Sequence, residues 1–297
     1  MSFRSTIFVL VAFLALLISF DRLGAMILRH GLDINFGLDQ ESDVLILGHS
    51  HITLATDKTR MEKELGVSIS KYARPGVTVA DRYVMAKQYL DKFQGKKLKH
   101  VLYGVDQFTF SDKGLSENSY ALFYPWMDDA GVSAYVKDCA SAQQFWIHKL
   151  FHLTRYTDET IYASISGFCR SWKNRKHSVM NTSVYDAKLA KKNERTIHIE
   201  DSSYELLYKT IRMFTDKGIR VTLVNLPTYY RLHEYETEKY AAICNIFSQI
   251  ACENEYVEYL DLNDEICENH EFFRDALHVN YKGQQATTDK LIQSLAL

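Results

Sequence analysis

The sequence is poor in proline and has no regular cysteine pattern. Only three of its 297 residues are proline, and its five cysteines are irregularly spaced without a C-x-x-C pair. This pattern argues against a disulfide framework and against a structural zinc site. The formal net charge is −2, which lacks the basic excess of nucleic-acid-binding proteins, so we expect no nucleic-acid partner. Walker A and G-x-G-x-x-G loops are absent as well.

The composition is that of a folded globular chain. Hydrophobic residues make up 46% and charged residues 24% of the sequence, which excludes an intrinsically disordered protein. The length allows either two domains or one large α/β domain with an insertion.

The N-terminal segment is strongly apolar. Residues 7–20 carry no charge, and Asp21 and Arg22 follow them directly. This run is shorter than the roughly 20 residues that cross a bilayer core, but the flanking apolar residues complete a span. An uncleaved signal anchor, a cleaved signal peptide and a buried core helix are the alternatives.

We expect the anchor. Leu23-Gly24-Ala25 is a poor cleavage site, and the apolar character continues beyond it to residue 28. The predicted organisation is a transmembrane helix over residues 1–28, a linker over 29–42 and a domain over 43–297. The protein is then a single-pass cell-membrane protein whose main domain lies outside the cytoplasm.

Beyond the linker, short apolar runs alternate with amphipathic segments, which predicts an α/β fold with a parallel sheet covered on both faces. The expected strands are residues 44–47, 67–72, 101–103, 220–225 and 257–260. The expected helices are residues 59–65, 79–93, 203–217, 236–252 and 282–295. The alternation breaks over about residues 111–200, which we interpret as an insertion. Within it residues 132–151 look helical, and we expect a solvated basic loop or helix face over 170–192.

Ser50 follows the first strand in the sequence Gly48-His49-Ser50-His51. A serine at a sharp turn from strand to helix presents its hydroxyl for nucleophilic attack, and its N–H lies near a helix N-terminus. The alternative is a serine that only caps the helix. The neighbouring His51 is expected either to line the pocket or to be a solvated loop residue.

A second motif, Asp275-Ala276-Leu277-His278, precedes the last helix. An aspartate three residues before a histidine can orient the imidazole, and the other ring nitrogen can then take a proton from a nucleophile. Parallel strands place the residues that follow them at one edge of the sheet, where sites of such folds lie.

With Ser50 after the first strand and D-x-x-H before the last helix, the chain resembles the SGNH/GDSL hydrolase superfamily. The resemblance covers the chain after residue 43 apart from the insertion, and it implies a three-layer flavodoxin-like fold of about five parallel strands. It further implies a Ser50–His278–Asp275 triad, with oxyanion donors after the second and third strands. Gly76 occupies the first of those places and Asp106 the second.

Two residues depart from the family pattern. His49 stands in place of the usual Asp of the first block, and Asp106 in place of the usual Asn of the third. An ionised carboxylate offers no hydrogen to an oxyanion, so Asp106 is either protonated or has another role, such as orienting the acceptor hydroxyl.

The G-h-D form of the third block and the anchor resemble the membrane-anchored branch associated with polysaccharide O-acylation, which includes alginate acetylation and D-alanine transfer proteins. The resemblance implies a serine esterase or O-acyltransferase that acts on a cell-surface or secreted glycan, with a multispanning O-acyltransferase as a possible partner. This chemistry requires neither a metal nor a cofactor.

Two other interpretations stay open. The chain can be a non-catalytic glycan-binding or accessory subunit of a membrane-bound O-acyltransferase system, which the Asp106 substitution favours. G-H-S-H also resembles a block of binuclear metallophosphoesterases, but the other blocks of that family occur in reversed order or not at all.

Overall fold

The computed structural model describes residues 3–111, 118–170, 172, 176–192 and 194–295. Residues 112–117, 171, 173–175 and 193, which fall in the predicted insertion, lie outside the described residues. The chain divides into two compact units: Met1–Asn35 with Tyr120–Ser171, and Phe36–Ser119 with Trp172–Leu297. The middle of the insertion therefore groups with the N-terminal helix, a division that the expected boundaries do not follow.

The second unit contains a five-stranded parallel sheet with the order β2-β1-β3-β4-β5. Its strands are β1 (Val44–Gly48), β2 (Ile69–Ala73), β3 (His100–Val105), β4 (Arg220–Asn225) and β5 (Val257–Asp261). Every residue of β1 and β2 is buried, as expected for strands covered on both faces. The expected flavodoxin-like α/β fold is confirmed.

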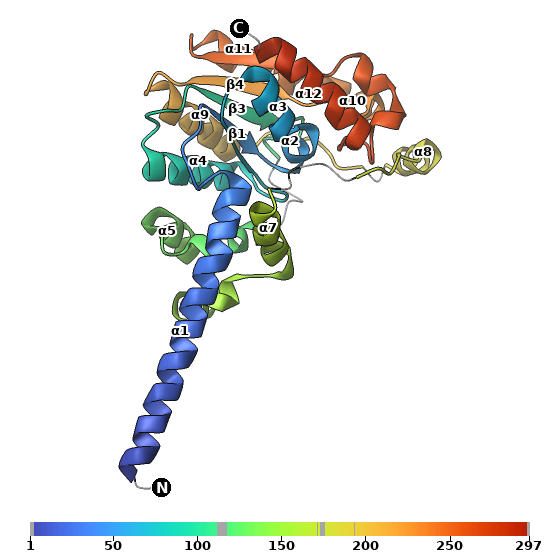
Figure 1. Cartoon of the computed structure of the whole chain (residues 1–297). Helices are drawn as coiled ribbons and strands as arrows, with labels where there is room; N and C mark the ends of the chain where they lie inside the picture. Colours follow the sequence, from blue (N-terminus) through green and yellow to red (C-terminus); the bar gives the residue numbers. More distant parts are fainter. Residues whose placement is uncertain (1–2, 112–117, 171, 173–175, 193, 296–297) are drawn as a thin grey trace. The chain divides into compact units, whose positions relative to one another are not determined.

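Helices cover both faces of this sheet (Figure 1). On one face lie α4 (Val79–Phe93) and α9 (Asp201–Thr215), which pack against each other, while α11 (Thr237–Cys252) packs on β5. On the other face α12 (Tyr281–Leu295) packs on α2 (Ser50–Ala55) and α3 (Lys58–Leu65). Right-handed crossovers account for this distribution, because β2 lies on one side of β1 and the later strands lie on the other. The chain order reverses between β1 and β3, where ligands of such folds bind.

Short elements outside the sheet layers complete this unit. They are α8 (Thr182–Ala190), α10 (Tyr230–Tyr235) and the 3-10 turns η3 (Glu265–Glu268) and η4 (His270–Phe272). The segment expected as a solvated basic loop or helix face thus contains α8, which begins at the N-cap Asn181.

The first unit is helical. Its elements are α1 (Phe3–Phe36), η1 (Ser119–Trp126), α5 (Ala130–Cys139), α6 (Ala142–Leu150), η2 (His152–Arg155) and α7 (Asp158–Phe168). Two end residues, Phe36 of α1 and Ser119 of η1, belong to the second unit. The helical character expected over residues 132–151 is confirmed, and it is divided between two helices: Ser141 forms a capping box with Gln144 and begins α6.

Helix α1 has 34 residues and is long and apolar enough to cross a membrane. Its most apolar 18-residue window has a mean hydropathy of 2.3, and none of that window is buried. The buried-core-helix alternative is therefore wrong. The helix continues to Phe36, into the segment expected as a linker.

Candidate active site

Ser50 is the first residue of α2, directly after the N-cap His49. Helix α2 can begin directly after β1 because two glycines of the sheet leave room for it. A Cβ added at Gly48, the last residue of β1, would lie 2.7 Å from Ile52 Cγ2, and one added at Gly104 in β3 would lie 2.8 Å from Ile52 Cβ. Both glycines thus admit Ile52, whose helix carries Ser50 at the carboxyl edge of the sheet.

A buried lysine fixes the other end of α2. Lys71 Nζ of β2 donates hydrogen bonds to the carbonyl oxygens of Thr53 at 2.8 Å and Thr56 at 2.6 Å. These carbonyls belong to the last turn of the helix, where backbone acceptors lack intrahelical partners. Burial lowers the pKa of Lys71 to about 7. The α2 segment is therefore held at both ends, by glycines at its start and by Lys71 at its end.

His278 and Asp275 lie in a closed turn before α12. An isolated bridge pairs Phe273 with Val279, and Arg274 N donates to His278 O at 2.9 Å. Within the turn, Asp275 Oδ1 accepts hydrogen bonds from Leu277 N at 3.0 Å and His278 N at 2.9 Å. These local bonds fix the carboxylate beside the imidazole that follows it three residues later.

Ser50, His278 and Asp275 form a continuous hydrogen-bonded chain across more than two hundred residues of sequence. Ser50 Oγ lies 2.8 Å from His278 Nε2, and His278 Nδ1 lies 2.9 Å from Asp275 Oδ1 and 3.1 Å from Oδ2. A carboxylate only accepts hydrogen bonds, so Nδ1 carries the proton and the Nε2 lone pair faces the serine hydroxyl. This arrangement allows His278 to take the Ser50 proton.

The pKa of Asp275 is lowered from its usual value. Burial alone would raise it, but the hydrogen bond and charge of His278 and the two backbone N–H donors outweigh burial. The carboxylate therefore stays ionised at neutral pH and remains able to hold the imidazole N–H.

Gly76 follows β2 in a turn with φ +81°. A Cβ at this position would meet no atom within 4 Å, so the backbone conformation, not crowding, is what favours glycine here. Gly76 is only half-buried, and the turn follows the strand that neighbours β1.

Asp106 follows β3 and is 3% exposed. Its Oδ2 lies 3.0 Å from His49 Nε2 and 3.5 Å from His51 Nδ1, while its Oδ1 accepts from Phe108 N at 2.8 Å. Burial alone would raise the pKa of Asp106, but the two imidazoles hold it well below its usual value. An ionised, buried Asp106 favours a role other than donation to an oxyanion.

The two histidines that flank Ser50 are both turned inward. His51 is 0% exposed, its Nε2 donates to the Pro227 carbonyl at 3.0 Å, and its ring lies 6.1 Å from that of His278. The alternative of a solvated loop histidine is therefore wrong for His51. Burial lowers the pKa of His49, against the opposing effect of the Asp106 carboxylate.

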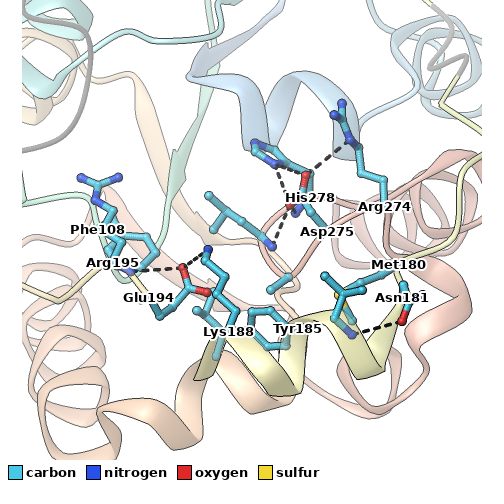
Figure 2. A pocket seen from close by; sticks show the side chains of 14 residues that line it. Phe108, Met180, Asn181, Tyr185, Lys188, Glu194, Arg195, Arg274, Asp275 and His278 are labelled. Atoms are coloured by element: carbon cyan, nitrogen blue, oxygen red, sulfur yellow. Dashed lines mark hydrogen bonds and ion pairs between the residues drawn. The ribbon is translucent and has the colours of Figure 1, made fainter. Parts of the chain in front are cut away.

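A cavity of about 480 Å³ opens beside the D-x-x-H turn. Asp275 and His278 line it together with side chains of α8 and of the segment that follows it (Figure 2). Its apolar wall includes Phe108, Val184 and Leu232, and its charged groups are Lys188, Glu194, Arg195 and Arg274. Ser50, His51, Gly76 and Asp106 do not belong to its lining, so of the three triad residues only Asp275 and His278 face this cavity.

Sequence reasoning missed most of this lining. Lys188 and Glu194 form an ion pair of 3.0 Å, and Arg195 stacks on Phe108 with 4.5 Å between the guanidinium carbon and the ring centre. Lys188, Glu194 and Arg195 lie in the predicted insertion, where no strand or helix pattern pointed to the site, and Phe108 lies just before it. Arg274 could have been found, because it directly precedes the motif aspartate.

The described residues contain no group of three or more His, Cys, Asp or Glu side chains that could hold a metal ion.

No protein-family model and no curated protein matches the chain. Solved structures with a similar backbone include a "putative platelet activating factor" from Streptococcus pneumonia, with 12% identity and a TM-score of 0.43 over 99% of this chain and 100% of that chain. A "putative acylhydrolase" from Bacteroides fragilis has 12% identity and a TM-score of 0.42, over 85% of each chain. A "putative lipolytic protein of G-D-S-L family" from Desulfitobacterium hafniense has 10% identity and a TM-score of 0.42, over 85% of this chain and 98% of that chain. The last title names the superfamily that the motif order resembles, but likeness at this level carries no argument about activity.

Proposed function

We propose that the chain is a membrane-anchored SGNH-type serine acyl-ester hydrolase or O-acyltransferase. The observation that carries the proposal is the hydrogen-bonded chain from Ser50 Oγ through His278 to Asp275. A serine that merely capped α2 would not need an imidazole 2.8 Å from its hydroxyl, nor a carboxylate behind that imidazole.

In the first half-reaction Ser50 Oγ attacks the ester carbonyl carbon while His278 Nε2 takes the serine proton. The ionised Asp275 stabilises the imidazolium that forms. The Ser50 and Gly76 N–H groups are the proposed oxyanion donors, and each such donor typically contributes about 3 kcal/mol to stabilisation of the transition state. Collapse of the tetrahedral intermediate breaks the bond to the leaving alcohol, which receives the proton from His278, and leaves an acyl group on Ser50.

In the second half-reaction His278 takes a proton from an acceptor whose oxygen attacks the acyl carbon. Collapse of this tetrahedral intermediate breaks the bond between Ser50 Oγ and the acyl carbon, and His278 returns the proton to Ser50. Water as the acceptor makes the protein an esterase, and a sugar hydroxyl makes it an O-acyltransferase. The cavity beside His278 offers apolar and charged groups together, and its size lies in the usual range of small-molecule sites. We propose an acyl ester of a cell-surface or secreted glycan as the substrate, with a multispanning O-acyltransferase as a partner.

The location follows from α1. Its length and hydropathy suit a single membrane span, and a signal anchor places the unit that carries Ser50 on the outer side of the membrane.

Asp106 is proposed as a positioning residue. Its carboxylate joins the loop after β3 to His49, the residue directly before Ser50, and so couples the ends of the two central strands. In this proposal Asp106 does not donate a hydrogen bond to the oxyanion, which is the role of the asparagine usual at this position in the resembling superfamily.

Turnover of p-nitrophenyl acetate by the full chain in detergent tests the proposal. Ser50→Ala should reduce the rate to the background of the buffer, whereas Ser202→Ala, which changes an exposed serine of α9, should leave it unchanged. A wild-type protein that binds glycan but never exceeds background would instead support the non-catalytic accessory subunit. Equal turnover by wild type and Ser50→Ala would contradict the proposed nucleophile.

A further inference from the structure

The first unit carries an exposed apolar edge at the end of α6. Trp146 is 57%, Ile147 39%, Leu150 58% and Phe151 58% exposed. We call these four residues the α6 edge. Large apolar side chains gathered on a protein surface mark a contact with another molecule or with a membrane.

Hydrogen bonds tie this edge to one level of α1. The Asp21 carboxylate accepts from His152 N at 2.9 Å and from Leu153 N at 2.8 Å. The neighbouring Arg22 donates from Nη2 to Leu150 O at 3.2 Å. Both charged residues of this part of α1 are thus used to hold the turn between α6 and η2.

The same two residues mark the end of the uncharged run of α1. The helix begins at Phe3 and has no charge between residue 7 and residue 20. Residues 5–20, between Arg4 and Asp21, span about 24 Å at 1.5 Å per residue, so most of the roughly 30 Å of a bilayer core is crossed before Asp21. In the proposed membrane span, Asp21 and Arg22 stand at the outer edge of the hydrocarbon, and the α6 edge lies at the same level of α1.

The rest of the unit lies farther along α1. Figure 1 shows the first half of α1 running clear of α5 and α7. Helix α7 packs at Gly31, where an added Cβ would clash with Ser164 and Phe168. Gly31 is ten residues beyond Asp21, or about 15 Å along the helix. The α6 edge is thus nearer to the apolar run of α1 than α7 is.

We infer that the α6 edge inserts into the headgroup region of the bilayer that α1 crosses. Tryptophan is enriched at that depth, where its apolar ring and its N–H are both accommodated. Leu150 and Phe151 would bury apolar area in the acyl boundary, as interfacial helices do. The protein is then held by one spanning helix and one interfacial contact, which restricts the tilt and rotation of the first unit.

Full-length protein in lipid nanodiscs tests this inference, with tryptophan emission as the readout. The chain has three tryptophans; Trp126 is fully buried, and Trp126 and Trp172 stay constant in all variants. Nanodiscs of phosphatidylcholine brominated near the headgroup should quench wild-type emission, and Trp146→Phe should remove most of that loss. The double variant Trp146→Phe/Tyr162→Trp moves the reporter to a 65% exposed position on α7. Its emission should not be quenched by the brominated lipid as wild-type emission is.

Three results would overturn the inference. They are equal quenching of wild type and Trp146→Phe, equal quenching of Trp146 and the relocated tryptophan, and quenching of Trp146 by aqueous iodide to the extent seen in a soluble tryptophan peptide. The last result is expected if the α6 edge faces water in the nanodisc because its contact is a partner protein that the sample does not contain. The inference rests on the proposed membrane span of α1, but esterase activity is not part of the readout, so its failure and a failure of the proposed chemistry are distinguishable.

Discussion

His49 and Asp106 are the two residues that depart from the SGNH/GDSL motif pattern that the sequence resembles, and they contact each other: 3.0 Å separates His49 Nε2 from Asp106 Oδ2. One lies at the end of β1 and the other at the end of β3. Without Asp106, the His49 N–H would lose its carboxylate acceptor, and without His49, the buried Asp106 carboxylate would lose this N–H donor. Together they make an imidazole–carboxylate pair that bridges the two central strands.

Exchanging both residues tests this complementarity. His49→Asp should reduce turnover strongly, because it places two carboxylates side by side in a buried site. Asp106→Asn should also reduce turnover, since His49 loses its charged partner. The double variant His49→Asp/Asp106→Asn, which carries the residues usual in the family, should recover a substantial part of the lost kcat. Steady-state kinetics decide the matter, and a double variant no better than the worse single one would argue against a functional pair.

The glycine at the end of β1 should be replaceable only when Ile52 is shortened. Gly48→Ala places a methyl group 2.7 Å from Ile52 Cγ2 and should cost about 1–3 kcal/mol of stability through overpacking. Ile52→Ala removes the opposing atoms but leaves a cavity. A double-mutant cycle on thermal unfolding should show the pair to be less destabilised than the sum of the singles. Additive effects would mean that Ile52 does not govern the need for glycine.

Asp275→Asn should preserve the fold and remove most of the activity. The amide still accepts from the Leu277 and His278 N–H groups, but it no longer stabilises a charged imidazole or fixes its tautomer. The expected loss in kcat is on the order of 10³–10⁴, with a change in Tm of no more than a few degrees. The matched control, Asp216→Asn at the exposed end of α9, should retain full activity. A loss of less than tenfold at Asp275 would contradict its assignment.

His233 should make the second unit sensitive to mild acid. Burial lowers the pKa of His233 to about 4 from 6.5, so the unfolded chain binds this proton more readily than the folded one. The stability that neutral His233 provides is complete above pH 6.5 and is lost as the pH falls towards 4, by about 2–3 kcal/mol. His233→Gln should flatten the fall in Tm between pH 6.5 and 4, whereas the exposed-site control His270→Gln should not. Parallel curves for wild type and His233→Gln would exclude this effect.

The sequence was sufficient to predict the sheet and its major helices. The strands expected at 44–47 and 220–225 are short, rich in branched apolar residues and followed by Gly48 and Pro227, and the structure places both within one residue of the expected limits. The break at Ser141 was not predicted, because apolar periodicity continues through it and only the cap to Gln144 marks the new helix. Helix α2 was also missed, since its six residues are too few to show a period.

Local sequence pattern alone predicts the candidate site only where a motif carries its own geometry, and the pairing of Ser50 with His278 was expected from the motif order of the resemblance. D-x-x-H folds back on itself through local bonds, so the Asp275–His278 pair could be expected from four letters. The 2.8 Å contact of His278 with Ser50 depends on the packing of α12 against α2, which no local pattern reveals. The burial of Asp106 between two imidazoles likewise depends on the register of β1 and β3, and the pocket wall from α8 lies in a segment without βα rhythm.

The most direct test of the account is labelling of the full chain by a fluorophosphonate probe, with the modified peptide identified by mass spectrometry. A serine activated by His278 should react covalently at Ser50, and labelling should vanish in Ser50→Ala and fall sharply in His278→Asn, but persist in Ser202→Ala. Labelling of wild type and Ser50→Ala to the same extent, or no labelling of folded wild type, would contradict the claim that Ser50 is a nucleophile.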